Sequence, residues 1–193
     1  MRNKLISTTL EVARRVMEPD VYRLLMRLDD SAMWGSDAER TEVLLPAVVR
    51  VLGMRGDVEA RRLRSFRLAD VAVSVIAPAA LDSAKLPEMA SRLRALVPIT
   101  DEVTATAARD ECRKVYVDVD DAADAYAATY AAACAVAAAA ADAAAAATVD
   151  ADADAADAAA ATYAAASAPE HDVWRSHVDA LLVAAGLADE KGA

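Results

Sequence analysis

Residues 57–81 read DVEARRLRSFRLADVAVSVIAPAAL, and their pattern sets the expectation for much of the chain. Apolar side chains recur here at the three- and four-residue spacing of a helix face, so we expect an amphipathic helix. Asp57 is a suitable N-cap, because its carboxylate can accept hydrogen bonds from the free amides of the first turn. Pro78 is expected to bend or break the helix, since proline lacks the backbone donor and its ring clashes with the preceding turn.

Similar helices are expected on both sides of this stretch. Ser36 and Glu39 have the spacing of a capping box, in which the serine oxygen accepts an amide proton and the glutamate reaches back. Trp34, in the loop before that box, is expected to fold onto the core. Pro46 is expected to kink or restart the helix that follows, because it removes one backbone hydrogen bond.

Further prolines and acidic residues mark other helix boundaries. Asp20 is expected to cap a helix directly after Pro19. Pro87 suits the first turn of a short helix. Asp101 begins another helix, because acidic side chains favour the positive end of the helix dipole. Asp172 is expected to cap a final amphipathic helix.

Alanine dominates the C-terminal half of the chain. The 193 residues include 52 alanines, of which 31 lie among the 48 residues of 121–168, and residues 100–167 contain no glycine or proline. This composition strongly favours helix. A single helix over 101–168 would extend about 100 Å. Because that length exceeds a compact domain of this size, we expect a reversal near Val117–Asp121 or Thr148–Asp150.

These observations predict an all-α protein. We expect a helical bundle of amphipathic helices with a long Ala/Asp-rich helix or helical hairpin in the C-terminal half. Residues 1–100 would form the helical core, and residues 101–168 an Ala-rich acidic segment packed on it. Residues 169–193 would add a C-terminal helix, all within one domain.

The charge of the chain is unevenly distributed. The formal net charge is −10, with +3 on residues 1–100 and −13 on residues 101–193. No lysine or arginine occurs from Val115 to Trp174. Such asymmetry suggests an interaction surface, or docking of one half on the other, although a solvated acidic face is the simpler interpretation.

The sequence favours a cytoplasmic location. No run of large apolar residues is long enough to span a bilayer, and the first residues lack the apolar region of a signal peptide. Free thiols are expected, because Cys112 and Cys134 would be about 33 Å apart on one continuous helix. Such a separation excludes a disulfide within that helix.

Motifs that carry chemistry are scarce. His171 and His177 are six positions apart, which does not place two metal ligands on one helix face. Asp150, Asp152 and Asp154 resemble the start of a calcium loop, but alanine replaces the glycine and glutamate that such a loop requires. The five glycines form no phosphate-binding loop. We therefore predict no catalytic, cofactor-binding or metal-binding residues, and no small-molecule substrate is evident.

One candidate interaction surface is basic. Arg61, Arg62, Arg64 and Arg67 lie close together on the expected helix, and Arg55 precedes them. These guanidinium groups could contact the phosphates of a nucleic acid. The alternative is a solvated stripe, or one that docks on the acidic half of the chain.

A second candidate surface lies on the Ala-rich segment. Tyr126 and Tyr130 are spaced by four residues and share an uncharged side, whereas Asp150, Asp154 and Asp157 form an acidic stripe. Alanine lets helix backbones approach closely, so a dimer through the uncharged side is plausible. The carboxylates would be spaced one per about 6 to 7 Å of helix, which is sparse for a protein that mimics the charge density of DNA.

The runs LLPAVVRVLG (44–53), EARRLRSFRLADVAVSVIAPAAL (59–81) and SRLRALVPITD (91–101), followed by the Ala/Asp/Tyr tract, resemble a family. It comprises Ala-rich helical proteins of actinobacteria and their phages, mostly of unknown function and loosely similar to immunity-type helical proteins. The resemblance covers roughly residues 40–168. It implies an accessory protein and brings no catalytic residues.

The sequence thus predicts a non-enzymatic helical interaction protein of a phage or an actinobacterium. Its partner would be another protein or a second copy, through the Ala-rich helices. Two alternatives are nucleic-acid binding through the Arg55–Arg67 cluster, and an acidic DNA mimic or immunity-type inhibitor. No cofactor and no membrane association are expected.

Overall fold

The computed structural model describes residues 18–31, 34–51, 58–120, 158 and 171–189, and the regular secondary structure of these residues is helical throughout. This confirms the predicted all-α class. The elements are α2 (Pro19–Asp29), α3 (Asp37–Val51), α4 (Val58–Val71), the π-helical turn η1 (Ala72–Ile76), α5 (Ala77–Ser83), α6 (Pro87–Arg94), α7 (Glu102–Asp120) and α10 (His171–Ala184).

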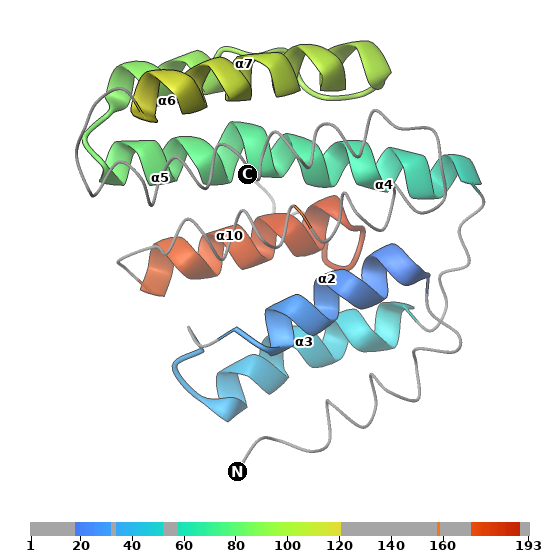
Figure 1. The fold of residues 1–193 in the computed structure, drawn as a ribbon. Helices are drawn as coiled ribbons and strands as arrows, with labels where there is room; N and C mark the ends of the chain where they lie inside the picture. The colour runs from blue at the N-terminus through green and yellow to red at the C-terminus, as the bar shows by residue number, and fades with distance from the viewer. Residues whose placement is uncertain (1–17, 32–33, 52–57, 121–157, 159–170, 190–193) are drawn as a thin grey trace.

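A long central helix organises the bundle. The helices α4, η1 and α5 follow one another without interruption over 26 residues, which corresponds to about 39 Å. Figure 1 shows α6 and α7 on one side of this central helix and α10 on the other, with α2 and α3 beyond α10. The C-terminal helix therefore lies between the N-terminal pair and the central helix.

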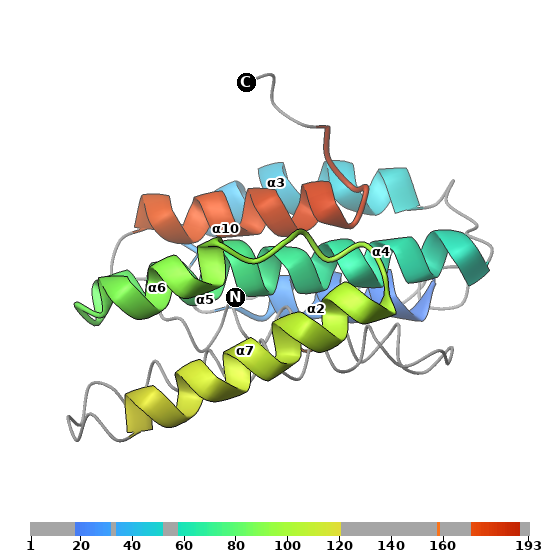
Figure 2. The ribbon, with the colours of Figure 1, turned by 90° about the horizontal axis from the view of Figure 1, so that it is seen from above.

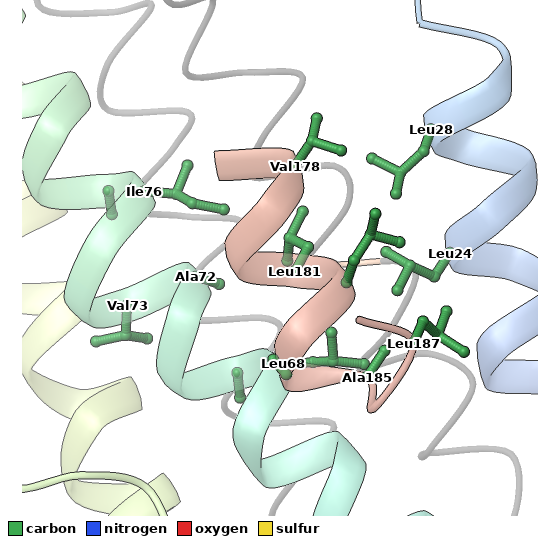
Figure 3. Close-up of a cluster of buried hydrophobic side chains, with 14 of the residues drawn as sticks. Leu24, Leu28, Leu68, Ala72, Val73, Ile76, Val178, Leu181, Ala185 and Leu187 are labelled. Atoms are coloured by element: carbon green, nitrogen blue, oxygen red, sulfur yellow. The ribbon is translucent and has the colours of Figure 1, made fainter. Parts of the chain in front are cut away.

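A large part of the core lies around α10. Leu68, Ala72 and Ile76 of the central helix face Leu181 and its neighbours on α10, and all of these side chains are buried. Figure 3 shows side chains of α2 approaching α10 from its other side. Because α10 is buried against both neighbours, it joins two parts of the molecule that are far apart in sequence.

Pro78 is accommodated without a break in the central helix. It occupies the first turn of α5, directly after η1, and the amide of Ala77 donates to the carbonyl of Ala72, five residues back. A wider π-helical turn relieves the clash that proline would make with the preceding α-helical turn. Of the two predicted effects of Pro78, a bend or a break, the break is therefore wrong, because the chain passes through the π-helical turn η1 into α5.

Pro46 also lies inside a helix. The helix α3 runs from Asp37 to Val51 through Pro46, so the expected restart is wrong. Pro46 and Glu42, four residues earlier, have exposed side chains. On this side of α3, water can satisfy the Glu42 carbonyl that proline leaves without an amide donor.

Three predicted helix starts are confirmed, whereas the N-cap predicted at Asp172 is wrong because α10 already includes His171. The N-cap predicted at Asp57 lies outside the described residues. The Glu39 amide donates to Ser36 Oγ at 3.1 Å, and Glu39 Oε2 accepts from the Gly35 amide at 2.9 Å. Asp101 caps α7 through its carboxylate, which accepts the Thr104 amide at 2.8 Å. Pro87 begins α6 as expected.

The start of α2 differs from the prediction. Pro19 itself is the first residue of the helix and Glu18 is the N-cap, so Asp20 does not cap it. The fixed backbone angle of proline and its missing donor suit this first position.

Trp34 folds onto the core as predicted. Its Nε1 donates to the carbonyl of Leu28 at 2.8 Å, at the end of α2. Its ring meets that of Trp174 on α10 edge to face, with centroids 4.6 Å apart. The loop between α2 and α3 is thereby attached to the C-terminal helix.

Two helices end in the same kind of turn. Lys85 after α5 and Gly186 after α10 have positive φ angles of 63° and 73°. In both turns the amide of this residue donates to the carbonyl three residues back, and the following amide to the carbonyl five residues back, at 2.7 to 2.9 Å. This is the Schellman arrangement, in which glycine is the favoured residue.

We predict that Leu181→Ala lowers the free energy of unfolding by about 2 to 5 kcal/mol, because it leaves a cavity in the centre of the core. Urea denaturation measures this difference. Leu63→Ala, at a position where 44% of the side chain is exposed, is the control and should change stability by less than about 1 kcal/mol. Equal effects of the two substitutions would contradict the described core.

Lys85→Gly should raise the free energy of unfolding by about 0.5 to 1 kcal/mol, because glycine adopts a positive φ without the steric penalty of a Cβ atom. Thermal or urea denaturation measures the change. Gly186→Ala is the converse control and should lower stability by about 1 kcal/mol. A Lys85→Gly protein no more stable than the original would argue against the described turn.

Candidate binding groove

A groove lies between the central helix, the segment before α7, and α10. Its volume is about 720 Å³, and its walls come from residues 67–71 of α4, residues 98–100, and residues 179–189 of α10 and the following turn. In Figure 2 the segment between α6 and α7 crosses over α4, with α10 beside it. A cavity of this size is in the range of ligand-binding sites.

The segment that forms one wall is held in place by Asp70. Asp70 Oδ1 accepts the backbone amide of Ile99 at 2.8 Å, and the Ile99 side chain is buried in the core. The neighbouring Pro98 and Thr100 remain exposed and line the groove. One hydrogen bond and one buried side chain thus fix this wall against α4.

Asp70 is also the charged group of the groove with the most perturbed environment. Burial raises the pKa of its carboxyl, and the hydrogen bond from the Ile99 amide opposes this shift in part. Burial disfavours the charged form because the ion loses contact with water. Asp70 therefore anchors the wall, but the partial burial of its charge lowers the stability of the folded state.

The other two carboxylates of the groove are paired outside it. Asp179 accepts from Arg175 one turn earlier on α10, at 3.3 Å. Asp189 accepts from Arg50 of α3 at 2.7 Å. These pairs neutralise much of the negative charge along the α10 wall.

Arg67 differs from these residues. It is exposed on α4, it lines the groove, and it makes no ion pair or hydrogen bond within the described part of the chain. Its guanidinium is planar and can bind a carboxylate with two parallel hydrogen bonds. Among the described residues that line the groove, Arg67 is therefore a cation without a carboxylate partner.

The predicted basic cluster is dispersed around α4. Arg61 pairs with Glu18 at 3.1 Å, and both side chains are largely buried. Arg62 pairs with Glu102 at the start of α7 and lies over the ring of Phe66. Arg64 is buried. The structure thus brings none of these three to the groove beside Arg67, and nucleic-acid binding stays a prediction.

Several predicted interaction residues lie outside the described residues. They are Tyr126, Tyr130, Asp150, Asp154 and Asp157 of the Ala-rich segment, together with Arg55 of the basic cluster. The helix α7 continues through residues 117–120, so the predicted reversal does not occur within them. Asp121 and the second predicted reversal, near residues 148–150, lie outside the described residues.

The described residues offer no other cluster of chemistry-bearing groups. His177 is buried on α10, and this burial lowers the pKa of its imidazole. Cys112 is buried on α7 and forms no disulfide with a described residue. Within the described ranges, no three histidine, cysteine or acidic side chains converge as metal ligands, and no helix has the length and apolar character needed to cross a bilayer.

The sequence did not reveal the groove. Three separate segments form it, and the individual signals, Pro98 before a helix start and an aspartate inside an apolar helix, are common in helical proteins.

Comparisons with family models, with curated proteins and with solved structures found no match for this chain. The resemblance to Ala-rich helical proteins thus stays a prediction.

Asp70→Asn should raise the free energy of unfolding at pH 7, because the amide oxygen can still accept the Ile99 amide without a buried charge. The raised pKa means that Asp70 disfavours the folded state only above its unfolded pKa of 3.8. The gain should therefore vanish as the pH falls below 3.8. Urea denaturation at several pH values measures it, and Glu42→Gln, at an exposed carboxylate, is the control.

Proposed function

We propose that this chain is a non-enzymatic helical interaction protein that associates with a second copy of itself. The groove between α4 and α10 would receive a helical segment rich in small residues from the other copy. The proposal keeps the cytoplasmic location and the role of a phage or actinobacterial accessory protein that the sequence predicts.

The lining of the groove is the observation that carries this proposal. Its apolar surface comes from Val71, Ile99 and Val183, together with Ala180, Ala184 and Ala188 along α10 and its end. Ala180 and Ala184 are one helical turn apart, so α10 presents small side chains on this side. A helix can approach such a surface closely, and interaxial distances fall as the contact side chains become smaller.

The chain itself supplies a segment with matching properties. Residues 121–157 contain 23 alanines and no side chain larger than tyrosine, and they carry no lysine or arginine. Only the sequence of this segment enters the proposal, since it lies outside the described residues. Small side chains on both partners favour contact by shape, and each buried alanine adds little apolar area. We therefore expect a weak, reversible association.

The other functions that the sequence allowed receive less support from the described residues. Arg61 and Arg62 are in ion pairs and Arg64 is buried, which leaves Arg67 alone in the groove. Nucleic-acid binding usually relies on several exposed cations along one face. The DNA-mimic alternative depends on carboxylates outside the described residues.

We predict that Thr100→Trp weakens self-association at least tenfold, because the indole would fill the groove from its exposed edge. Sedimentation velocity of the full chain over a range of concentrations measures this. Val97→Trp is the matched control: it lies three residues earlier in the same segment, is 70% exposed and does not line the groove. It should associate like the original chain.

Two results would contradict the proposal. One is a chain that remains monomeric at the highest accessible concentration. The other is a Thr100→Trp protein that associates as strongly as the Val97→Trp protein, which would place the contact elsewhere.

A further inference from the structure

We infer that Arg67 selects the segment that enters the groove by binding one of its carboxylates. This inference rests on the proposed function and adds the chemistry of recognition to it. The apolar lining would accept many small-residue helices, whereas Arg67 would distinguish the acidic ones.

The charges of the groove lead to this assignment. Asp70 is satisfied by the Ile99 amide, Asp179 by Arg175 and Asp189 by Arg50. Arg67 is the lining cation, and no carboxylate of the described residues pairs with it, whereas the partner of Asp70 is a backbone amide. A basic segment would meet three carboxylates that already have donors, and it would approach an arginine of its own sign. An acidic segment would instead complete the ion pair that Arg67 lacks.

The position of Arg67 fits this task. It lies one turn before Asp70 on α4, at the edge of the groove, and its side chain is exposed. An arginine at an exposed edge keeps its charged end hydrated until a partner arrives, while its aliphatic part covers apolar surface. Its planar guanidinium can then form two parallel hydrogen bonds to a carboxylate. A lysine would not offer this geometry.

The chain carries an excess of suitable carboxylates in its C-terminal half. Residues 121–157 include seven aspartates and no cation, whereas residues 1–100 carry a net charge of +3. The net charge of −10 on every copy opposes association in general. A local pair between Arg67 of one copy and an aspartate of the other would offset part of this repulsion at the contact itself.

A labelled synthetic peptide with the sequence of residues 121–157, titrated into the full chain and followed by fluorescence anisotropy, tests the inference. The original chain should bind the peptide, and Arg67→Glu should weaken binding at least tenfold. Lys85→Glu is the matched control: it is also exposed and gives the same net charge, but it lies away from the groove. It should bind nearly as well as the original chain.

A second peptide separates a specific pair from general charge effects. With all seven aspartates changed to asparagine, it should bind weakly to the original chain and to the Arg67→Glu protein alike. A peptide with lysine at these positions should instead prefer the Arg67→Glu protein. This restoration by exchanged charges would not occur if Arg67 merely stabilised the fold.

The inference and the proposed function can fail separately. If Thr100→Trp abolishes self-association and Arg67→Glu leaves both association and peptide binding unchanged, the groove is the contact but Arg67 does not select the segment. If Arg67→Glu and Lys85→Glu weaken binding equally, the effect is one of net charge and the inference is wrong. If Thr100→Trp has no effect, the proposed function itself is wrong.

Discussion

The burial of α10 against the central helix is the interaction on which the rest of the structure depends. Leu68, Ala72 and Ile76 form one side of this contact and Leu181 lies at its centre, all nearly inaccessible to water. Burial of apolar side chains is the dominant favourable contribution to folding. Since α2 packs on the far side of α10 (Figure 3), loss of this contact would also weaken the attachment of the N-terminal helices to the central helix.

The groove follows from the same contact. The last turn of α10 and the residues after it line the groove opposite α4, and the segment before α7 provides the third wall. That segment stays in place because Asp70 binds the Ile99 amide and Ile99 inserts into the core. The half-buried carboxyl of Asp70, with its raised pKa, is thus part of the framework that shapes the groove.

The arginines show how tertiary structure determines what a charge can do. Arg40 pairs with Asp29 and Asp37, and Arg92 pairs with Glu111 and Asp118. The latter carboxylates raise the pKa of Arg92, and the guanidinium lowers that of Glu111. Arg61 and Arg62 are likewise held in ion pairs and Arg64 is buried, whereas Arg67 is exposed.

The sequence by itself determined the helical class, the capping box at Ser36 and the helix starts at Pro87 and Asp101. These features depend on neighbouring residues, so local hydrogen bonding and backbone geometry are sufficient to establish them. Only the tertiary structure decided that a π-helical turn accommodates Pro78 and that Asp70 holds Ile99. It also decided which arginine remained exposed, because an ion pair such as Arg62 with Glu102 joins residues 40 positions apart. Such contacts exist only once α7 has packed against the bundle.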